Sequence, residues 1–198
     1  MSRAGRNVDL LTEIEEGAHD PKSDLATLLR KCITLGGLTG SESLRRWATL
    51  ELKGYDDGEQ LPAYREAVAP LLLDGTTFTH HVKGQMVDAM MIPDFAREYV
   101  NEDIPFRQPI GEIADLLAKA RADDGGIARL VPPGMSSLIP IINSTNTVQG
   151  GRVERIYWGV SSTVLVRILD VVRTNLVELV AEMRAGTPPG GPKPRAGL

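Results

Sequence analysis

The stretch from Ser161 to Ala185 constrains the fold most, because its apolar residues recur with the period of an α-helix. Their spacings alternate between four and three residues, which places them on one continuous seam along a long helix. Ser161 or Ser162 is a suitable N-cap for that helix, since a serine hydroxyl accepts a hydrogen bond from the first turn. The seam consists of Leu165, Leu169, Val172, Leu176, Leu179 and Met183.

Two interpretations of this seam stay open: docking on the chain's own core, and pairing with a second copy or a partner helix. The apolar face is widest in the first half, where Val164, Ile168 and Val171 flank the seam, and Asn175 interrupts the flank later. This narrowing favours docking of the first half and projection of the second. We therefore expect a homo-oligomer, with the seam as the candidate association surface.

The N-terminal third, residues 9–55, predicts three short helices. Asp9 is the expected N-cap of the first, Ser23 or Asp24 of the second, and Ser41 of the third. Each helix carries a single apolar face, and short helices are marginal in water when isolated. The three helices are therefore expected to pack together.

The middle of the chain mixes β-favouring runs with one clear helical period. The helix is expected to begin at Pro109, a residue suited to a first turn. Residues 135–143 are ambiguous between helix and strand, because Pro140 lies inside an apolar run. The predicted strands cover 68–73, 78–82, 87–92, 127–131 and 152–158.

These elements predict an α+β fold with an N-terminal three-helix unit, a small antiparallel sheet in the middle and a long C-terminal helix. We expect one domain over 9–185, because 198 residues suit a single core. Its parts are a helical unit (9–55), a mixed α/β middle (60–158) and the long helix (161–185). A flexible N-terminus (1–8) and a disordered Pro/Gly-rich tail (186–198) are expected to flank it.

Composition narrows the function classes. The formal net charge is −4, which argues against broad binding of nucleic acid, since such binding depends on Lys and Arg neutralising phosphates. Cys32 is the single cysteine, so an internal disulfide is excluded and a reducing cytoplasm is expected. No signal-peptide pattern and no apolar stretch of membrane-spanning length is present.

The titratable residues do not form a recognisable catalytic or metal-binding pattern. His80 and His81 are neighbours on a predicted strand, so their side chains point to opposite faces and cannot share one ion. Cys32 lies at helical spacing with leucines, as a core residue does. The acidic clusters at 56–59 and 123–124 lack calcium-loop spacing. We expect neither a cofactor nor a metal site.

Two patterns leave a ligand site open. The glycine-rich segment 35–43 resembles a phosphate-binding loop, although it follows a helix rather than a strand. Cationic residues also neighbour aromatic ones, as in nucleic-acid clamps and equally at packed helix–sheet junctions. These groupings are Arg45 and Arg46 with Trp47, and Arg152 and Arg155 with Tyr157 and Trp158.

Two segments together resemble the AbiTii domain of bacterial abortive-infection proteins. The first, residues 10–55, holds an acidic amphipathic helix, the LATLLRKC helix and a tryptophan followed by ELKGY. The second, residues 155–183, holds a strand, a serine-capped helix and the ILDVVR run. The marker residues are Trp47, Glu51, Leu52, Gly54, Tyr55, Leu169, Asp170 and Arg173.

The resemblance implies defence against phage, by a domain that acts as adaptor, sensor or oligomerisation module. We expect a self-associating, non-enzymatic protein that binds a protein partner or a phage component. The alternatives are a toxin-like nuclease using Arg155, Tyr157 or His81, and a nucleic-acid-binding regulator. Among the markers, we expect Trp47 and Leu52 in the core and Gly54 as a left-handed helix stop. A buried ion pair is expected among Glu51, Asp170 and Arg173.

Overall fold

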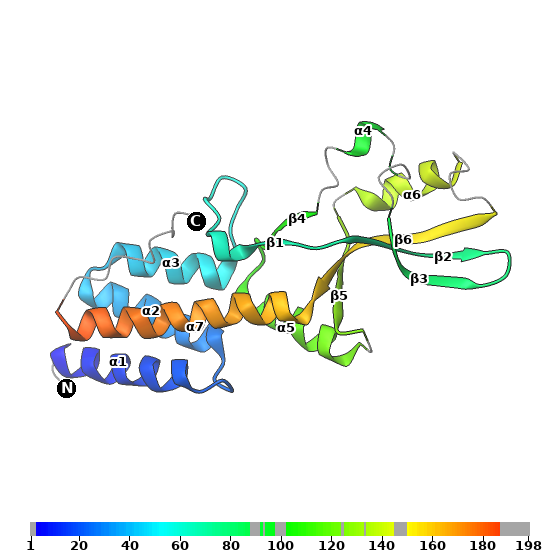
Figure 1. The fold of residues 1–198 in the computed structure, drawn as a ribbon. Helices are drawn as coiled ribbons and strands as arrows, with labels where there is room; N and C mark the ends of the chain where they lie inside the picture. The colour runs from blue at the N-terminus through cyan, green and yellow to red at the C-terminus, as the bar shows by residue number, and fades with distance from the viewer. Residues whose placement is uncertain are drawn as a thin grey trace. The chain divides into compact units, whose positions relative to one another are not determined.

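The computed structural model describes residues 3–87, 92, 94–97, 102–123, 125–132, 134–144 and 150–186. The chain forms two compact units (Figure 1). Unit 1 comprises Met1–Arg65, Phe106–Leu116 and Leu165–Leu198, and unit 2 comprises Glu66–Pro105 and Leu117–Val164. The predicted α+β class is confirmed: helices come first, antiparallel sheets follow, and a long helix closes the described chain.

Unit 1 is a helical assembly around one apolar core. Helices α1 (Arg3–His19), α2 (Leu25–Thr39), α3 (Glu42–Lys53) and the unit 1 part of α7 (Ser162–Arg184) lie side by side (Figure 1). Their apolar faces meet in a single buried cluster, as the helical periods predict. This core includes Ile14, Leu28, Leu29, Cys32, Leu35, Leu44, Trp47, Ile110, Val172 and Leu176.

Short-range capping fixes the ends of these helices. Asp24 caps α2 by accepting from the main-chain N–H groups of Ala26 and Thr27, and Ser41 caps α3, so both predictions are confirmed. The prediction for the first helix is wrong in position. Because α1 already begins at Arg3, Asp9 lies inside it and does not cap it.

The predicted C-terminal helix is confirmed as α7, and its seam packs into the core of unit 1. Leu165, Val172, Leu176 and Leu179 are buried, while Leu169 and Met183 are partly buried against the same cluster. In this conformation the seam is occupied by the chain's own helices. Its role in self-association stays a prediction.

Unit 2 is built on a four-stranded antiparallel sheet in the order β3-β2-β6-β5. The strands are β2 (Leu71–Thr77), β3 (His81–Met86), β5 (Ile127–Leu130) and β6 (Gly151–Ser161). The strands expected at 127–131 and 152–158 are confirmed. Those expected at 68–73 and 78–82 begin about three residues too early, because 78–80 forms the turn between β2 and β3. Most of the strand expected at 87–92 lies outside the described residues.

The ambiguous segment at 135–143 is a helix, α6 (Met135–Ser144), and it contains Pro140. Its Asn143 amide donates to the Val153 carbonyl of β6 at 2.9 Å and accepts from the Val153 N–H at 2.8 Å. The amide thus takes the place of a neighbouring strand at this point of β6. This pairing satisfies backbone groups that an unprotected strand edge would leave open.

The remaining elements are short, apart from α5 (Ile110–Ala122), which begins directly after Pro109 as predicted. Strands β1 (Glu66–Val68) and β4 (Asp103–Pro105) form a separate antiparallel pair. A short 3-10 helix, η1 (Ala63–Arg65), ends unit 1's first segment, and α4 spans Asp94–Arg97. Among the described residues, no helix is both long and apolar enough to cross a membrane. Nearly all of the predicted tail, from 187 onward, lies outside them.

Candidate functional site: the buried Glu51 and Arg65 network

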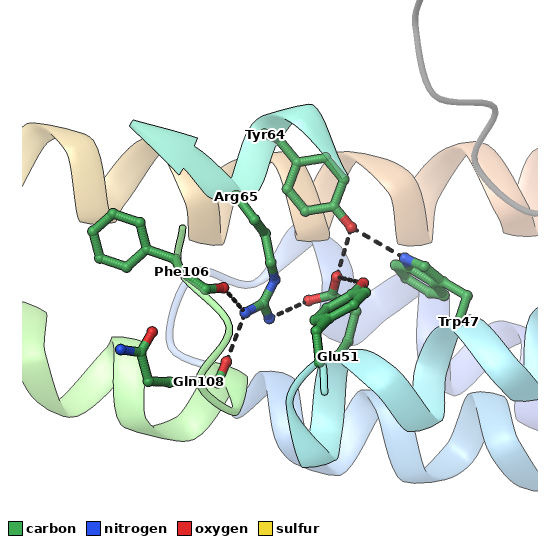
Figure 2. Close-up of polar contacts among 7 residues, drawn as sticks. Trp47, Glu51, Tyr64, Arg65, Phe106 and Gln108 are labelled. Atoms are coloured by element: carbon green, nitrogen blue, oxygen red, sulfur yellow. Dashed lines mark hydrogen bonds and ion pairs between the residues drawn. The ribbon is translucent and has the colours of Figure 1, made fainter. Parts of the chain in front are cut away.

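The most connected group of polar side chains centres on an ion pair inside unit 1. Glu51, on α3, and Arg65, in η1, are both 0% exposed, and Arg65 Nη2 donates to Glu51 Oε2 at 2.6 Å (Figure 2). Removing such charges from water costs several kcal/mol each unless partners surround them. The network is therefore defined by how completely these two groups are partnered.

Two tyrosines complete the hydrogen bonding of the carboxylate. The hydroxyls of Tyr55 and Tyr64 each donate to Glu51 Oε1 at 2.6 Å. The Trp47 indole N–H in turn donates to the Tyr64 oxygen at 3.2 Å. Trp47 and Glu51 are four residues apart on α3, so the helix brings them to one side (Figure 2), and Tyr55 follows directly after the Gly54 cap. Each carboxylate oxygen therefore accepts at least one short hydrogen bond.

Arg65 connects this cluster to a distant segment of the chain. Its Nη1 donates to the carbonyls of Phe106 at 2.9 Å and Gln108 at 2.6 Å, and its guanidinium carbon lies 5.0 Å from the centroid of the Tyr55 ring. The Arg65 carbonyl also accepts from the Phe106 N–H at 2.8 Å. The Arg65 Nε and Gln108 Oε1 atoms are buried without a hydrogen-bond partner in the described structure. Arg65 thus holds the strand-like segment at 106–108 against α3.

Gly54 is required at the same junction. It ends α3 with φ +94°, in the region that favours glycine, although its ψ of 174° differs from that of a left-handed helix. A Cβ here would lie 2.7 Å from the Arg107 carbonyl oxygen, closer than real Cβ contacts allow. The next residue, Tyr55, donates its main-chain N–H to that same carbonyl at 2.8 Å. The glycine therefore permits the close approach that seats Tyr55.

The electrostatics keep the tyrosines protonated. Burial raises the pKa of both the Tyr55 and Tyr64 hydroxyls, and the negative charge of Glu51 raises these pKa values further. Both tyrosines therefore act as hydrogen-bond donors to a carboxylate that also faces a guanidinium. Since the ion pair is closed off from solvent, a substrate has no access to it. This arrangement suits a structural role, in which the ion pair holds segments of the chain together, and not a reactive centre.

The other charged markers do not join this pair, so the predicted ion pair among Glu51, Asp170 and Arg173 is wrong. The partner of Glu51 is Arg65, and Asp170 is exposed on α7. Arg173 instead donates to four main-chain carbonyls at the end of α1 and in the connection to α2, because α7 packs beside them. These acceptors are Gly17 (3.4 Å), Asp20 (3.0 Å), Pro21 (3.2 Å) and Ser23 (2.6 Å). A cation there also meets the partial negative charge of a helix C-terminus. Among the apolar markers, Trp47 is core as expected, and Leu52 is partly buried against it.

Unit 2 has a smaller polar cluster around Asp74, a buried residue on β2. Asp74 Oδ1 accepts from the Tyr157 hydroxyl at 2.8 Å and from the Gly84 N–H at 3.0 Å. Arg129 lies over the Tyr157 ring, 5.6 Å from its centroid, and also pairs with Asp123 at 3.4 Å. Burial, followed by the hydrogen bond to Asp74, raises the pKa of Tyr157. The sequence analysis singled out Tyr157 but missed Asp74, whose one signal is an acidic residue inside an apolar strand.

The remaining candidates from the sequence lie apart from these clusters. His80 lies in the β2–β3 turn, where its Nδ1 meets the hydroxyls of Thr77 and Thr79, and His81 begins β3. Cys32 is buried, and burial raises its thiol pKa to about 12. The glycine-rich segment at 35–43 forms the end of α2, the connection through Gly40 and Ser41, and the start of α3. Within the described part of the chain, no cluster of three or more His, Cys, Asp or Glu side chains is arranged to hold a metal ion.

Comparison with known proteins gives one match. No curated protein and no solved structure matches the chain. The family model of AbiTii matches residues 9–195, which is nearly the whole sequence and includes both segments on which the resemblance was based. The chain therefore belongs to the AbiTii family.

Proposed function

We propose that this protein takes part in abortive-infection defence by binding and not by catalysis, associating with itself and with a protein partner or a phage component. Membership of the AbiTii family implies abortive-infection defence against phage. The binding role is supported by the state of the marker residues. Trp47, Glu51 and Tyr55 build a closed, buried network, so the residues that characterise the domain hold its fold together.

The exposed apolar side chains of unit 2 also support a binding role. Among the described residues, the exposed large hydrophobic side chains are Val8 in unit 1 and, in unit 2, Val68, Phe78, Met86, Val131 and Ile141. Exposed apolar side chains of this kind are available for contact with another surface. Apart from Val8, the large apolar side chains described in unit 1 are buried or half-buried. We therefore assign partner contact to unit 2 and mechanical support to unit 1.

The nuclease alternative depends on Tyr157, Arg155 or His81 as a reactive group. Tyr157 is buried, its hydroxyl donates to Asp74, and its raised pKa keeps it protonated, which makes it a poor nucleophile. Arg155 and His81 are exposed, and no side-chain hydrogen bond or ion pair joins either of them to a carboxylate among the described residues. These contacts favour binding over cleavage.

A phage challenge tests the proposed function. Bacteria expressing the chain alone are infected at low and at high phage dose, and growth is followed beside cells carrying the empty vector. We expect protection at low dose and collapse of the culture at high dose, because abortive infection sacrifices infected cells. Equal lysis of both cultures by a broad phage panel would contradict a defence activity carried by this chain.

Two measurements on the purified protein test the binding role. Sedimentation equilibrium is expected to give a mass above that of one chain at micromolar concentration. Incubation with labelled RNA and DNA is expected to leave both intact. A strictly monomeric protein would contradict self-association, and cleavage that is lost in Arg155→Ala would replace the binding role with a nuclease.

A further inference from the structure

We infer that the β2–β3 hairpin and the adjoining first half of β6 bind single-stranded nucleic acid. The inference rests on the proposed binding function and deepens it by naming a ligand class. It starts from the charge of this surface in an otherwise acidic chain. From Gly75 to Val87 the sequence contains Lys83 and two histidines but no Asp or Glu, whereas the whole chain has a net charge of −4.

Strand pairing brings two arginines and a histidine close together around Asp74 and Thr76. Thr76 of β2 is opposite His81 of β3 on one side and Arg152 of β6 on the other, and Asp74 is opposite Arg155. Paired residues of antiparallel strands project to the same face, so Thr76, His81 and Arg152 share one, while Arg155 lies beside Asp74 across the register slip. The side chains of His81, Arg152 and Arg155 are exposed. Neither arginine side chain has a hydrogen bond or ion pair with the residues that the structure describes.

Asp74 and Glu154 are the carboxylates that the strand register places beside these residues. Asp74 is buried and accepts from Tyr157 and Gly84, so it offers little exposed charge. Glu154 falls at the irregularity where β6 slips against β2, and has no opposite residue there. A β-bulge of this kind turns side chains away from the regular alternation. This stretch of β6 therefore carries two exposed arginines against one exposed carboxylate, Glu154.

An aromatic platform stands at the tip of the hairpin. Phe78 is 93% exposed, and its ring lies against the backbone of Gly150, where any Cβ would collide with it. The turn that displays it is fixed by hydrogen bonds between Thr77 and His80, including Thr77 N–H to the His80 carbonyl at 2.9 Å. An exposed aromatic ring displayed on an ordered turn can stack on a nucleobase.

An open pocket of about 640 Å³ adjoins Arg152. Its lining includes Thr76, Arg152 and Glu154 of the sheet and Pro140 and Asn143 of α6. The lining sets the cationic Arg152 beside the Glu154 carboxylate, so a phosphate with its attached sugar or base would contact the Arg152 side of the hollow. Exposed cations, a displayed aromatic ring and a polar pocket together match the pattern of single-strand binding, in which the backbone follows positive charge and bases stack.

The test is fluorescence anisotropy of a labelled oligonucleotide of about 12 nucleotides, as DNA and as RNA, titrated with the full chain at several salt concentrations. We expect micromolar binding at low salt. The logarithm of the binding constant should fall with the logarithm of salt with a slope near −2, since Lys83, Arg152 and Arg155 would each neutralise about one phosphate.

Variants separate charge from stacking. Arg152→Glu with Arg155→Glu should weaken binding at least about tenfold. The same variant should reduce the magnitude of the salt slope from about 2 to below about 1. Phe78→Ala should weaken binding about tenfold while leaving the slope unchanged, because stacking carries no charge. Arg30→Glu with Lys53→Glu makes the same change in net charge on exposed residues of unit 1 and should bind like the unaltered chain.

Three results would overturn the inference: absence of salt-sensitive binding, equal weakening by the unit 1 variant, or equal competition by polyglutamate, which would point to an acidic protein partner. Circular dichroism of each variant confirms that it is folded. Phage protection without oligonucleotide binding would remove this inference and leave the proposed function standing. Oligonucleotide binding without phage protection would support this inference and contradict the proposed function.

Discussion

At Glu51 a carboxylate is kept from water by two hydroxyls and a guanidinium, and each of these donors comes from a different residue of the same unit. Such a pair contributes little net stability compared with an apolar replacement, because desolvation offsets the attraction between the charges. Loss of one member of the pair is strongly destabilising, since the remaining charge stays buried without its partner. The pair therefore enforces one arrangement of α3, η1 and residues 106–108.

Glu51→Gln is expected to lower the free energy of unfolding by about 3–5 kcal/mol, because Arg65 is left buried without a counter-charge. Urea denaturation followed by circular dichroism measures the change. The double variant Glu51→Leu with Arg65→Met serves as the control and should lose less stability than the single variant. A double variant that is less stable than Glu51→Gln would show that the ion pair itself is strongly stabilising.

Cys32 gives a prediction about pH at the same scale. Its thiol pKa is raised from 9.0 to about 12 in the folded state, so the thiol stays protonated where an unfolded chain would ionise. The associated stability is complete below about pH 9 and is lost as pH rises towards 12, since only the unfolded state releases the proton in that range.

Cys32 should therefore be unreactive towards a disulfide reagent at pH 8 in the native protein and react fully in urea. Absorbance of the released thiolate follows the reaction. Rapid modification of the native protein, at a rate near that of the urea-unfolded chain, would show that the thiol is accessible and would contradict its burial in the core.

The elements differ in how far the sequence predicts them. Helix starts at Asp24 and Ser41 were predictable because an N-cap acts on the next two or three residues. The boundaries of β2 and β3 were not, because they depend on pairing with strands elsewhere and on the register shift at Asp74 and Gly75. The Glu51 partners were missed for a similar reason. Arg65 lies beyond an irregular turn, where no periodicity links it to α3.

Gly54 and Gly40 form a matched pair of tests for the helix ends. Both have positive φ, but only at Gly54 would a Cβ meet neighbouring backbone, the Arg107 carbonyl. Gly54→Ala is expected to cost about 3 kcal/mol or more, from strain and collision together. Gly40→Ala should cost about 1 kcal/mol, from strain alone. Thermal unfolding compares them, and equal losses would contradict the close approach at Gly54.

At the scale of the whole molecule, the long helix α7 completes the apolar core of unit 1. The pattern of its seam was predictable from spacing alone, but a heptad repeat does not specify which surface it meets. The structure supplies that surface from α1, α2 and α3. Family membership was also accessible from the sequence, because the resemblance lay in the segments that form unit 1 and the end of β6.

Leu176→Glu with Leu179→Glu is expected to unfold unit 1, since both side chains are buried in its core and an unpaired carboxylate there costs several kcal/mol. Loss of helical circular dichroism measures this. Arg167→Glu, an exposed change on the same helix, is the control. If the double variant keeps its helicity and only its sedimentation mass falls, the seam is an association surface instead.

The central claim is that the Glu51–Arg65 network stabilises the fold of a binding domain and takes no direct part in its activity. The most direct test is a phage challenge of cells expressing the Glu51→Leu with Arg65→Met variant, beside cells protected by the unaltered chain, after circular dichroism has shown that the variant is folded. The account predicts protection equal to that of the unaltered chain, because apolar side chains can replace a buried ion pair whose role is structural. A folded variant that gives no protection would contradict it and place the network in the protein's activity.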